Sequence, residues 1–249
     1  MIKIENTEVV GWEAAIRGMR NPRNSWEKSD SYENYTVSYD KNEITDDVVE
    51  IRHPYYRVGA NDIDLMKKLA KAGTDHRKFM RMVVVYCDIT APLYWWKEFD
   101  TYKVGTVANS CSTMHKIADK EFTLEDFSCE HLLGLMSKDD ERTVPIIDVS
   151  PYHDKIIIYS PNGWLTGTIY LLNECRKWYL ETNDKKYWWQ MIQLLPSSYN
   201  QKRTVMLNYE VIANMYKSRK NHKLDEWVEL MTYFKETLPY SELFTGECN

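Results

Sequence analysis

The chain has 249 residues, of which 43% are hydrophobic, so it is long enough for one substantial core and does not require a second domain. Its 32 basic and 37 acidic residues give a net charge of -5, which excludes a general electrostatic attraction to duplex nucleic acid or to an anionic membrane. We therefore predict a single domain over residues 1–249, with neither duplex nucleic acid nor a membrane as its partner.

The cysteines and the first residues indicate a cellular compartment. The five cysteines are scattered and include no C-x-x-C pair, which is typical of a reducing cytoplasm. The first residues lack a basic start followed by an apolar run, and the longest dense apolar stretch, residues 82–87, is too short to span a bilayer. We predict a cytoplasmic protein. Cys129 and His131 have no second pair at metal-ligand spacing, so we expect no structural zinc.

The first half of the chain contains clear signals for two kinds of element. Residues 10–20 are compatible with a short helix, and the polar residues 21–35 with a loop. From Asn61, which we expect as a helix cap, apolar residues recur at helical spacing until Gly73. Residues 79–89 then predict a strand buried on both faces, and after Pro92 residues 93–102 predict an aromatic-rich helix.

The second half is mostly helical by periodicity. Residues 155–159 form a candidate strand, and helices are predicted over residues 124–136, 164–179, 186–194, 204–219 and 224–237. Strands supported by many helices indicate an α+β domain. The nine Trp and eighteen Tyr, many in adjacent pairs such as Trp95-Trp96, either pack a core or subunit interface or line a pocket for a flat ligand.

Two separated blocks carry more specific patterns. In the first block, His76 precedes the strand that ends at Ala91-Pro92, and a run from Thr101 to His115 follows the next helix. In the second block, Asn208 follows Pro196 by twelve residues, and Arg219 follows Asn208 by eleven. There is no G-x-x-x-x-G-K-[ST] loop and no G-x-G-x-x-G turn, so a P-loop and a dinucleotide-binding Rossmann motif are not supported.

Both blocks resemble the flavin-dependent thymidylate synthase (ThyX) family in residue order and spacing. The family shows a Gly-His turn, a strand ending in A-P, a helix and the signature R-H-R-x-x-S-x-N-E-x-S-x-R-Y, which aligns here with one extra residue before Asn109. Its later segment has the Leu-Pro, Asn and Arg spacing of the second block. The resemblance covers roughly residues 65–115 and 194–239, and it implies a central, mostly antiparallel sheet flanked by helices, with a helix-rich C-terminal half.

The resemblance also implies a reaction. Family members use flavin adenine dinucleotide (FAD) to supply reducing equivalents, with NADPH and methylenetetrahydrofolate as co-substrates, and they add one carbon to C5 of deoxyuridine monophosphate (dUMP). They do so without a cysteine nucleophile, and they are homotetramers whose sites are built from several subunits. The function implied is a divergent ThyX-like methyltransferase acting on dUMP or a related pyrimidine nucleotide.

Individual residues are assigned by the same resemblance. Arg219 is the candidate catalytic cation and also a nucleotide contact, because a guanidinium stays charged and binds a planar imide edge with paired hydrogen bonds. If residues 204–219 form a continuous helix, Asn208 lies on the same face as Arg219. The positions of family flavin contacts are held by His76, Tyr102, Lys103 and Asn208, and those of nucleotide contacts by Glu98, Ser110, Ser112 and Arg219.

Other interpretations of these residues stay open. His76 also fits a structural hydrogen-bonding role, and Asn208 and Arg219 also fit a helix cap and an exposed cation. The chain has Thr101-Tyr102-Lys103 in place of R-H-R, and Glu210 in place of a second-block arginine. These departures support an alternative function, a nucleotide sensor or sequestering protein that keeps the fold but has lost flavin. A purely structural assembly protein explains the aromatic residues but not Asn208 and Arg219.

Overall fold

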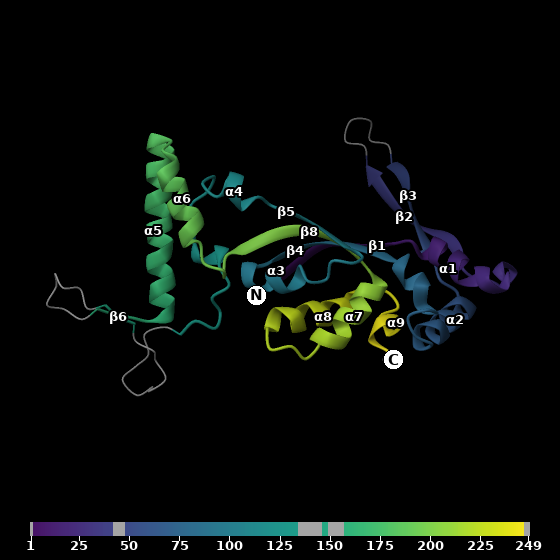
Figure 1. Cartoon of the computed structure of the whole chain (residues 1–249). Coiled ribbons are helices and arrows are strands. Elements are labelled where there is room, and N and C mark those ends of the chain that lie inside the picture. Colours follow the sequence, from purple (N-terminus) through teal and green to yellow (C-terminus); the bar gives the residue numbers. More distant parts are fainter. Residues whose placement is uncertain (1, 42–47, 134–145, 149–156, 247–249) are drawn as a thin grey trace. The chain divides into compact units, whose positions relative to one another are not determined.

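The computed structural model describes residues 2–41, 48–133, 146–148 and 157–246 (Figure 1). Contacts within the chain divide it into two compact units, and each unit is assembled from separate stretches of sequence. The first unit contains Met1–Ile4, Asp88–Thr101 and Asn109–Thr204. The second unit contains Glu5–Cys87, Tyr102–Ala108 and Val205–Asn249.

A four-stranded sheet contributes strands to both units. Its order is β1 (Lys3–Val10), β4 (Val84–Pro92), β8 (Asn200–Asn208) and β5 (Thr106–Ser110). The predicted α+β class is confirmed, with an antiparallel sheet flanked by helices and a helix-rich second half. A separate pair, β6 (Ile146–Asp148) and β7 (Ile157–Tyr159), is antiparallel. Of the strand expected at residues 155–159, β7 confirms residues 157–159, and residues 155 and 156 lie outside the described part.

Strand β4 differs in two ways from the prediction for residues 79–89. It begins later, because Arg77–Arg81 form the 3₁₀ helix η3. In addition, buried residues alternate along it with more exposed ones, as Val85 and Cys87 do with Tyr86. This period-2 pattern places one face of the strand in the core. The expectation of full burial on both faces was therefore wrong.

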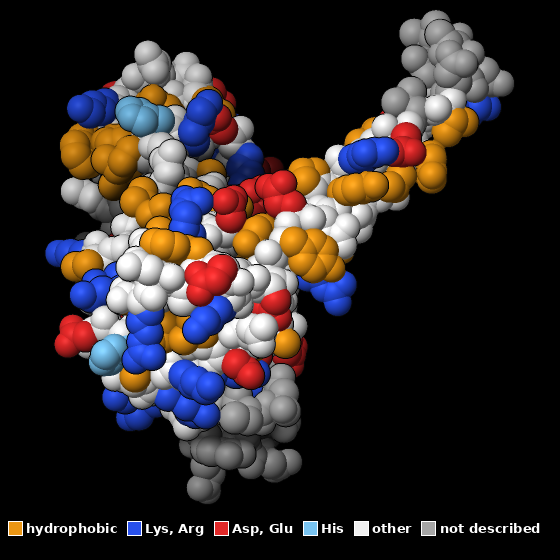
Figure 2. All heavy atoms as spheres, turned by 90° about the vertical axis from the view of Figure 1, so that its right-hand side faces the viewer, with side chains coloured by type: hydrophobic (Ala, Val, Ile, Leu, Met, Phe, Trp, Pro, Cys, Tyr) orange, Lys and Arg blue, Asp and Glu red, His pale blue; other side chains and the backbone are white. Residues whose placement is uncertain are grey.

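Three strands near the N-terminus were not predicted. One is β1, and the others are β2 (Tyr32–Lys41) and β3 (Val48–Arg57), which form an antiparallel hairpin with Tyr35 opposite Pro54. The hairpin carries apolar side chains on its exposed surface, including Tyr39, which is 70% exposed (Figure 2). Tyr35, Val37 and Tyr39 alternate with polar residues along β2, so a period-2 signal was present in the sequence although the strand is exposed along almost its whole length.

Most predicted helices are present. The expected helices of residues 10–20, 61–73 and 93–102 correspond to α1 (Trp12–Arg20), α2 (Ala60–Lys71) and α3 (Leu93–Phe99). In the second half, the predictions agree with α5 (Pro161–Thr182), α6 (Lys185–Leu194) and α8 (Asp225–Thr237). The N-cap of α2 is Gly59 and not Asn61, since Asn61 lies inside the first turn, where its backbone N–H donates to the Asp30 carboxylate (2.9 Å). Short helices α4 (Thr113–Lys116) and α9 (Glu242–Thr245), and the 3₁₀ turns η1 (Asn21–Arg23) and η2 (Trp26–Lys28), complete these regions.

Two predicted helices were wrong over part of their length. Of residues 124–136, only the 3₁₀ turn η4 (Leu124–Asp126) is helical, because Phe127 turns to extended backbone and enters the core; residues 134–136 lie outside the described part. The predicted helix of residues 204–219 is replaced at its start by β8, in which Val205 and Leu207 are buried. Helix α7 (Tyr209–Arg219) follows directly.

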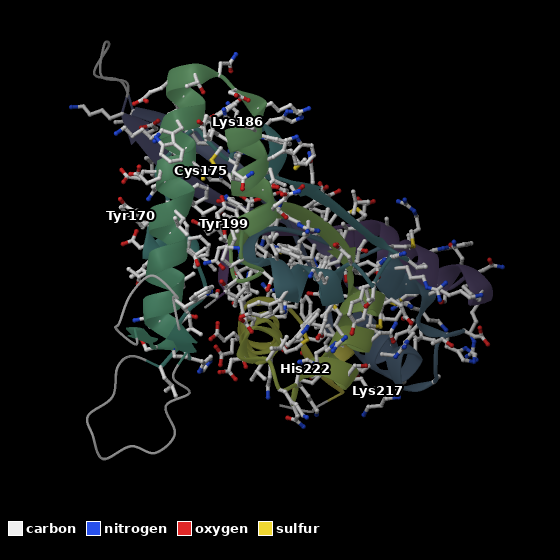
Figure 3. All side chains as sticks on the ribbon, turned by 60° about the vertical axis from the view of Figure 1, so that its left-hand side comes forward. Tyr170, Cys175, Lys186, Tyr199, Lys217 and His222 are labelled. Carbon is white, nitrogen blue, oxygen red and sulfur yellow. The ribbon has the colours of Figure 1, made fainter. Side chains whose placement is uncertain are left out.

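The core of the first unit lies between α5, α6 and residues 117–127. It contains Ile117, Ala118, Phe122, Phe127, Leu165, Ile169, Leu172, Cys175 and Met191, with Tyr199 packed against them. Figure 3 shows Cys175 on the inner side of α5 and Tyr170 on its outer side, where it is exposed. Burial raises the pKa of both the Cys175 thiol and the Tyr199 hydroxyl. On α3, the predicted aromatic residues Trp95, Trp96 and Phe99 are fully buried.

The core of the second unit is built on α7. Tyr209 packs edge-on against Trp12 of α1 and Phe244 of α9, with ring centroids 5.3 and 5.4 Å away. Its hydroxyl donates a hydrogen bond to the Pro239 carbonyl (2.6 Å), and burial raises its pKa. These contacts fix α7, so the side chains at its two ends have defined positions.

Candidate functional site

The predicted residues Asn208 and Arg219 lie at opposite ends of α7. Asn208 is the N-cap, and its side-chain oxygen accepts a hydrogen bond from the Val211 N–H (3.0 Å). Arg219 is the last helical residue. Asn208 has an extended backbone (φ -120°, ψ 166°) and is the last residue of β8, so helical spacing does not set the direction of its side chain. The capping role of Asn208, which the sequence left open, is therefore present.

The Arg219 guanidinium is held by aromatic and imidazole groups. Its Nε donates to the Tyr102 hydroxyl (3.0 Å), and its central carbon lies 4.9 Å from the ring centre of Trp227, which is fully buried on α8. Its Nη1 lies 2.8 Å from His222 Nε2. A guanidinium over an indole ring is stabilised by cation–π attraction. The result is a partly exposed cation with a defined orientation.

The loop after Tyr102 lies against the start of α7. Gly105 has a φ of +80°, and a Cβ atom there would come within 2.9 Å of the Asn208 amide nitrogen and 3.1 Å of Val211. Only glycine combines this backbone conformation with so close an approach. The structure thus brings Tyr102, Asn208 and Arg219 into one region of the second unit, and exposed Lys103 lies in the same loop.

His76 lies in a different part of the second unit. It is exposed at the start of η3 and lines a cavity of about 1380 Å³ between α1, α2 and the segment of residues 20–30. Five cationic side chains line the same cavity: Arg20, Arg23, Lys28, Lys68 and Lys78. Arg219 does not line it. Within a single chain, the structure therefore does not bring His76 and Arg219 into one cavity.

A buried ion pair supports the wall of this cavity. Arg20 Nε donates to Asp62 Oδ1 (2.7 Å), and the hydroxyls of Ser29 and Ser31 both donate to Asp62 Oδ2 (2.6 Å each). Arg20 also donates to the backbone carbonyls of Ser25 and Lys28, which holds the segment of residues 25–31 in place. Burial by itself raises the pKa of Asp62, but hydrogen bonds from Ser29, Ser31 and Arg20 outweigh it and lower the pKa.

This lowered pKa predicts acid sensitivity. Asp62 stabilises the folded state fully above its unfolded pKa, about 3.9, and this contribution is lost as the pH falls through the lower folded-state pKa. We expect the free energy of unfolding of the wild type to fall more steeply below about pH 4 than that of Asp62→Asn, which has no carboxylate to protonate. Urea titrations between about pH 6 and pH 3 measure both slopes. Parallel slopes would contradict the assignment.

Three predicted nucleotide contacts, Glu98, Ser110 and Ser112, belong to the first unit. Glu98 is half-buried on α3, and its backbone carbonyl accepts a hydrogen bond from the Thr101 hydroxyl (2.7 Å). Ser110 is exposed at the end of β5. Ser112 is the N-cap of α4, and its hydroxyl accepts from the His115 N–H (3.1 Å). Their roles as nucleotide contacts stay predictions.

Sequence reasoning missed several residues that shape these sites. Arg77 forms an ion pair with Glu210 (Nε to Oε2, 2.9 Å) and also donates to Asn214 (3.3 Å). The acidic residue that departs from the ThyX pattern is thus neutralised by a cation from η3. Trp227 and His222, which hold Arg219, were also missed. Arg77 and Trp227 come from elements other than α7, so no local motif links them to their partners, whereas His222 lies only three residues after Arg219.

None of the helices in the described ranges combines the length and apolar character needed to cross a bilayer. Among the same described residues, no three His, Cys, Asp or Glu side chains are grouped as metal ligands.

Comparisons with known proteins identify the fold of this chain. No protein-family model and no curated protein sequence matches the chain. Among solved structures, it is similar to thymidylate synthase X (ThyX) from Helicobacter pylori with FAD and dUMP, with a TM-score of 0.62, 13% identity, and coverage of 99% of this chain and 98% of that chain. The chain has a ThyX-like fold. A UMP/dUMP methylase, PolB from Streptomyces cacaoi bound with 5-Br UMP, is also similar, with a TM-score of 0.56, 12% identity, and coverage of 99% and 95%.

The ThyX-like fold agrees with the order of elements inferred from the first block. That block predicts a helix, a strand ending at Ala91-Pro92 and a second helix, and these are α2, β4 and α3. In the second block, Asn208 and Arg219 bound a single helix of the ThyX-like fold, α7. The spacing of eleven residues between them is therefore the length of one structural element.

Proposed function

We propose that this chain is a divergent ThyX-like enzyme that transfers a one-carbon unit to dUMP or a related pyrimidine nucleotide. The observation that carries the proposal is the fixed Arg219 guanidinium, which contacts Tyr102, His222 and Trp227. Structures with a similar fold contain dUMP or 5-Br UMP. A pyrimidine nucleotide is therefore the ligand class that we assign to this chain.

In this proposal, Arg219 acts on the base. Its guanidinium donates hydrogen bonds to the carbonyl edge of the uracil ring and stabilises the negative charge that develops there when the ring reacts. Tyr102 and Trp227 fix the guanidinium before the nucleotide binds, so little reorganisation is needed during the reaction. Ser112, Ser110 and Glu98 are the proposed contacts to the rest of the nucleotide.

The residues around His76 fit FAD as the cofactor. The cavity of about 1380 Å³ is larger than the roughly 300–1,000 Å³ of a typical small-ligand site, so it has room for a dinucleotide. Four of its lining cations, Arg23, Lys28, Lys68 and Lys78, suit a diphosphate, whereas Arg20 is paired with Asp62 and three carboxylates, those of Glu27, Asp30 and Asp75, also line the cavity. Bound FAD supplies the reducing equivalents of the reaction, with NADPH and methylenetetrahydrofolate as co-substrates. His76, Tyr102, Lys103 and Asn208 are the proposed contacts to it.

The proposal includes a homo-oligomer, with a tetramer as in the ThyX family. His76 and Arg219 do not line one cavity within a chain, so a site that uses both must combine residues from different copies. Large exposed aromatic side chains, such as Tyr39 and Trp164, are compatible with subunit contacts of this kind.

A flavin-binding measurement tests the proposed function. We expect the purified protein to show the visible absorbance bands of flavin, or to acquire them on addition of FAD followed by gel filtration. His76→Ala is expected to weaken FAD binding by about tenfold, the loss of one good polar contact. His53→Ala is the matched control, because this histidine bonds Ser38 in the hairpin (2.7 Å) and does not line the cavity.

The alternative function gives the opposite result. Glu210 and the Thr101-Tyr102-Lys103 sequence, which depart from the ThyX pattern, favour a nucleotide-binding protein without flavin. If the protein is colourless and does not bind added FAD, but still binds dUMP, this sensor or sequestering function replaces the enzymatic one.

A further inference from the structure

The hairpin of β2 and β3 forms a two-stranded sheet of its own. Among the described residues, no further strand pairs with the outer edge of β2 or of β3. All residues of β2 except Asn34 are exposed. A hairpin of two strands with neither a third strand nor a covering helix is only marginally stable in water. A strand added from another chain would therefore stabilise it.

The base of the hairpin is fixed to the second unit. Directly before β2, the Ser31 hydroxyl donates to the Asp62 carboxylate (2.6 Å) and accepts from the Gly59 N–H (2.9 Å). Gly59 follows the end of β3, so both strands are tied to the same buried ion pair at one end. The hairpin thus presents its edges from an ordered base.

Backbone hydrogen bonds identify the edge of β2 that is open to another strand. Tyr35 lies opposite Pro54, which has no N–H, and the Tyr35 N–H donates to the Asn34 side chain (2.9 Å). A residue whose N–H takes no part in an antiparallel ladder directs it to the outer edge, and this direction alternates along a strand. Tyr35, Val37 and Tyr39 therefore face the outer edge of β2, whereas Pro54 removes a donor from the outer edge of β3.

The middle of this open edge has no protection against pairing. Residues 35–39 read Y-T-V-S-Y, with no charged residue, proline or glycine. Natural proteins usually protect an edge strand with charges, proline or a bulge, because its free N–H and C=O groups bind other strands. Tyr35, Val37 and Tyr39 are 48%, 41% and 70% exposed and lie on one face of the hairpin (Figure 2).

The sequence of β2 is complementary to itself when it is reversed. Residues 33–41 read E-N-Y-T-V-S-Y-D-K, with Val37 at the centre. Two antiparallel copies centred on Val37 give four kinds of cross-strand pair: Glu33 with Lys41, Asn34 with Asp40, Tyr35 with Tyr39, and Thr36 with Ser38. Opposite charges, paired aromatic rings and hydroxyl pairs are the cross-strand contacts that stabilise antiparallel sheets. The residues that face the outer edge also oppose one another in this register, as backbone pairing requires.

We propose that β2 pairs with β2 of a second copy of this chain, antiparallel and about a two-fold axis at Val37. The result is a continuous four-stranded sheet in the order β3, β2, β2, β3. The Tyr35 N–H then donates to the Tyr39 carbonyl of the second copy in place of the Asn34 side chain. This inference deepens the homo-oligomer of the proposed function, and it rests on that part of the proposal.

Sedimentation velocity and light scattering of the purified full-length protein test this contact. The test variant is Val37→Lys, which places two ammonium groups opposite each other only where Val37 faces its own copy. We expect the two-fold contact to weaken by at least about tenfold, so that the main species has half the mass of the wild-type assembly. The matched control is Ile51→Lys on β3, because Ile51 is 38% exposed and lies on the opposite face of the hairpin. It is expected to keep the wild-type mass.

A pair of charge variants tests the register. Glu33→Lys places a lysine opposite Lys41 at both ends of the paired strands, and we expect it to weaken the contact by about tenfold. The double variant Glu33→Lys, Lys41→Glu exchanges both charges and is expected to restore the wild-type assembly. Circular dichroism and thermal unfolding verify that each variant is folded.

Several outcomes would overturn the inference. A wild type that stays monomeric up to millimolar concentration overturns it, and so does an unchanged mass in Val37→Lys or an equal loss of mass in Ile51→Lys. Failure of the double variant to restore the assembly overturns the register at Val37. FAD titrations of the same wild-type samples separate the two proposals. Halved mass in Val37→Lys with no FAD binding by the wild type supports the contact and contradicts the enzyme, and the reverse result contradicts the contact alone.

Discussion

Arg219→Ala is expected to reduce turnover of dUMP, or of the related nucleotide, by roughly 100- to 1,000-fold while leaving the fold intact. The guanidinium is the proposed partner of the charge that develops on the base, and alanine offers neither charge nor hydrogen bonds. Arg219→Lys restores the charge but not the paired donors, so we expect it to recover only part of the activity. Turnover assays, nucleotide titrations and circular dichroism measure these effects.

The control for Arg219 is Lys223→Ala, which removes an exposed cation near the end of the same helix. It is expected to retain wild-type turnover. Unchanged nucleotide affinity and turnover in Arg219→Ala would reject the assignment of this residue. If Arg219→Ala loses thermal stability as well as activity, the cause is instead the lost packing of Arg219 on Trp227. Arg219→Lys distinguishes this loss of packing from a loss of the catalytic charge.

Mixing two impaired variants extends the same test to the proposed oligomer, at an FAD concentration low enough to leave His76→Ala largely without cofactor. If sites combine His76 of one copy with Arg219 of another, exchange of Arg219→Ala and His76→Ala subunits creates some sites in which both residues are intact. We therefore expect the mixture to be more active than either variant alone. Activity that stays absent after verified subunit exchange would contradict a shared site.

Asp62→Ala is expected to destabilise the protein by about 3–5 kcal/mol, the typical cost of leaving one member of a buried ion pair without its partner. Arg20 and Asp62 are 4% and 0% exposed, so the remaining guanidinium stays buried without its carboxylate. Ser29 and Ser31 also lose the acceptor of their hydroxyl hydrogen bonds. Urea unfolding measures the loss, and weaker FAD binding is expected to accompany it, because the pair supports the cavity wall.

A matched control for this pair lies on the same helix as Arg20. Arg17 of α1 pairs with Glu13 at 3.1 Å, but both side chains are more than half exposed. Arg17→Ala is expected to cost about 0.3–0.5 kcal/mol, as for exposed helical pairs. Equal effects of Arg17→Ala and Asp62→Ala would show that the buried pair does not stabilise the second unit.

The local sequence was sufficient to predict the elements whose pattern lies within a single turn or a single helix. The periodicity of apolar residues predicted α2, α5, α6 and α8 close to their observed bounds, because a helix forms its backbone hydrogen bonds within itself. The spacing of Asn208 and Arg219 was also informative, since both belong to one helix and its cap. The resemblance to ThyX enzymes predicted the fold for a similar reason, because the order of helices and strands can be compared directly along the sequence.

Tertiary structure decided the rest. Residues 204–208 have an acceptable helical pattern, but they pair with the sheet as β8, and a strand obtains its hydrogen bonds from distant segments. Several partners of the residues in and around the candidate site are also distant in sequence. Tyr102 lies 117 residues from Arg219, Arg77 lies 133 residues from Glu210, and Arg20 lies 42 residues from Asp62. No pattern along the chain encodes such pairs, because only tertiary packing brings these side chains within reach of one another.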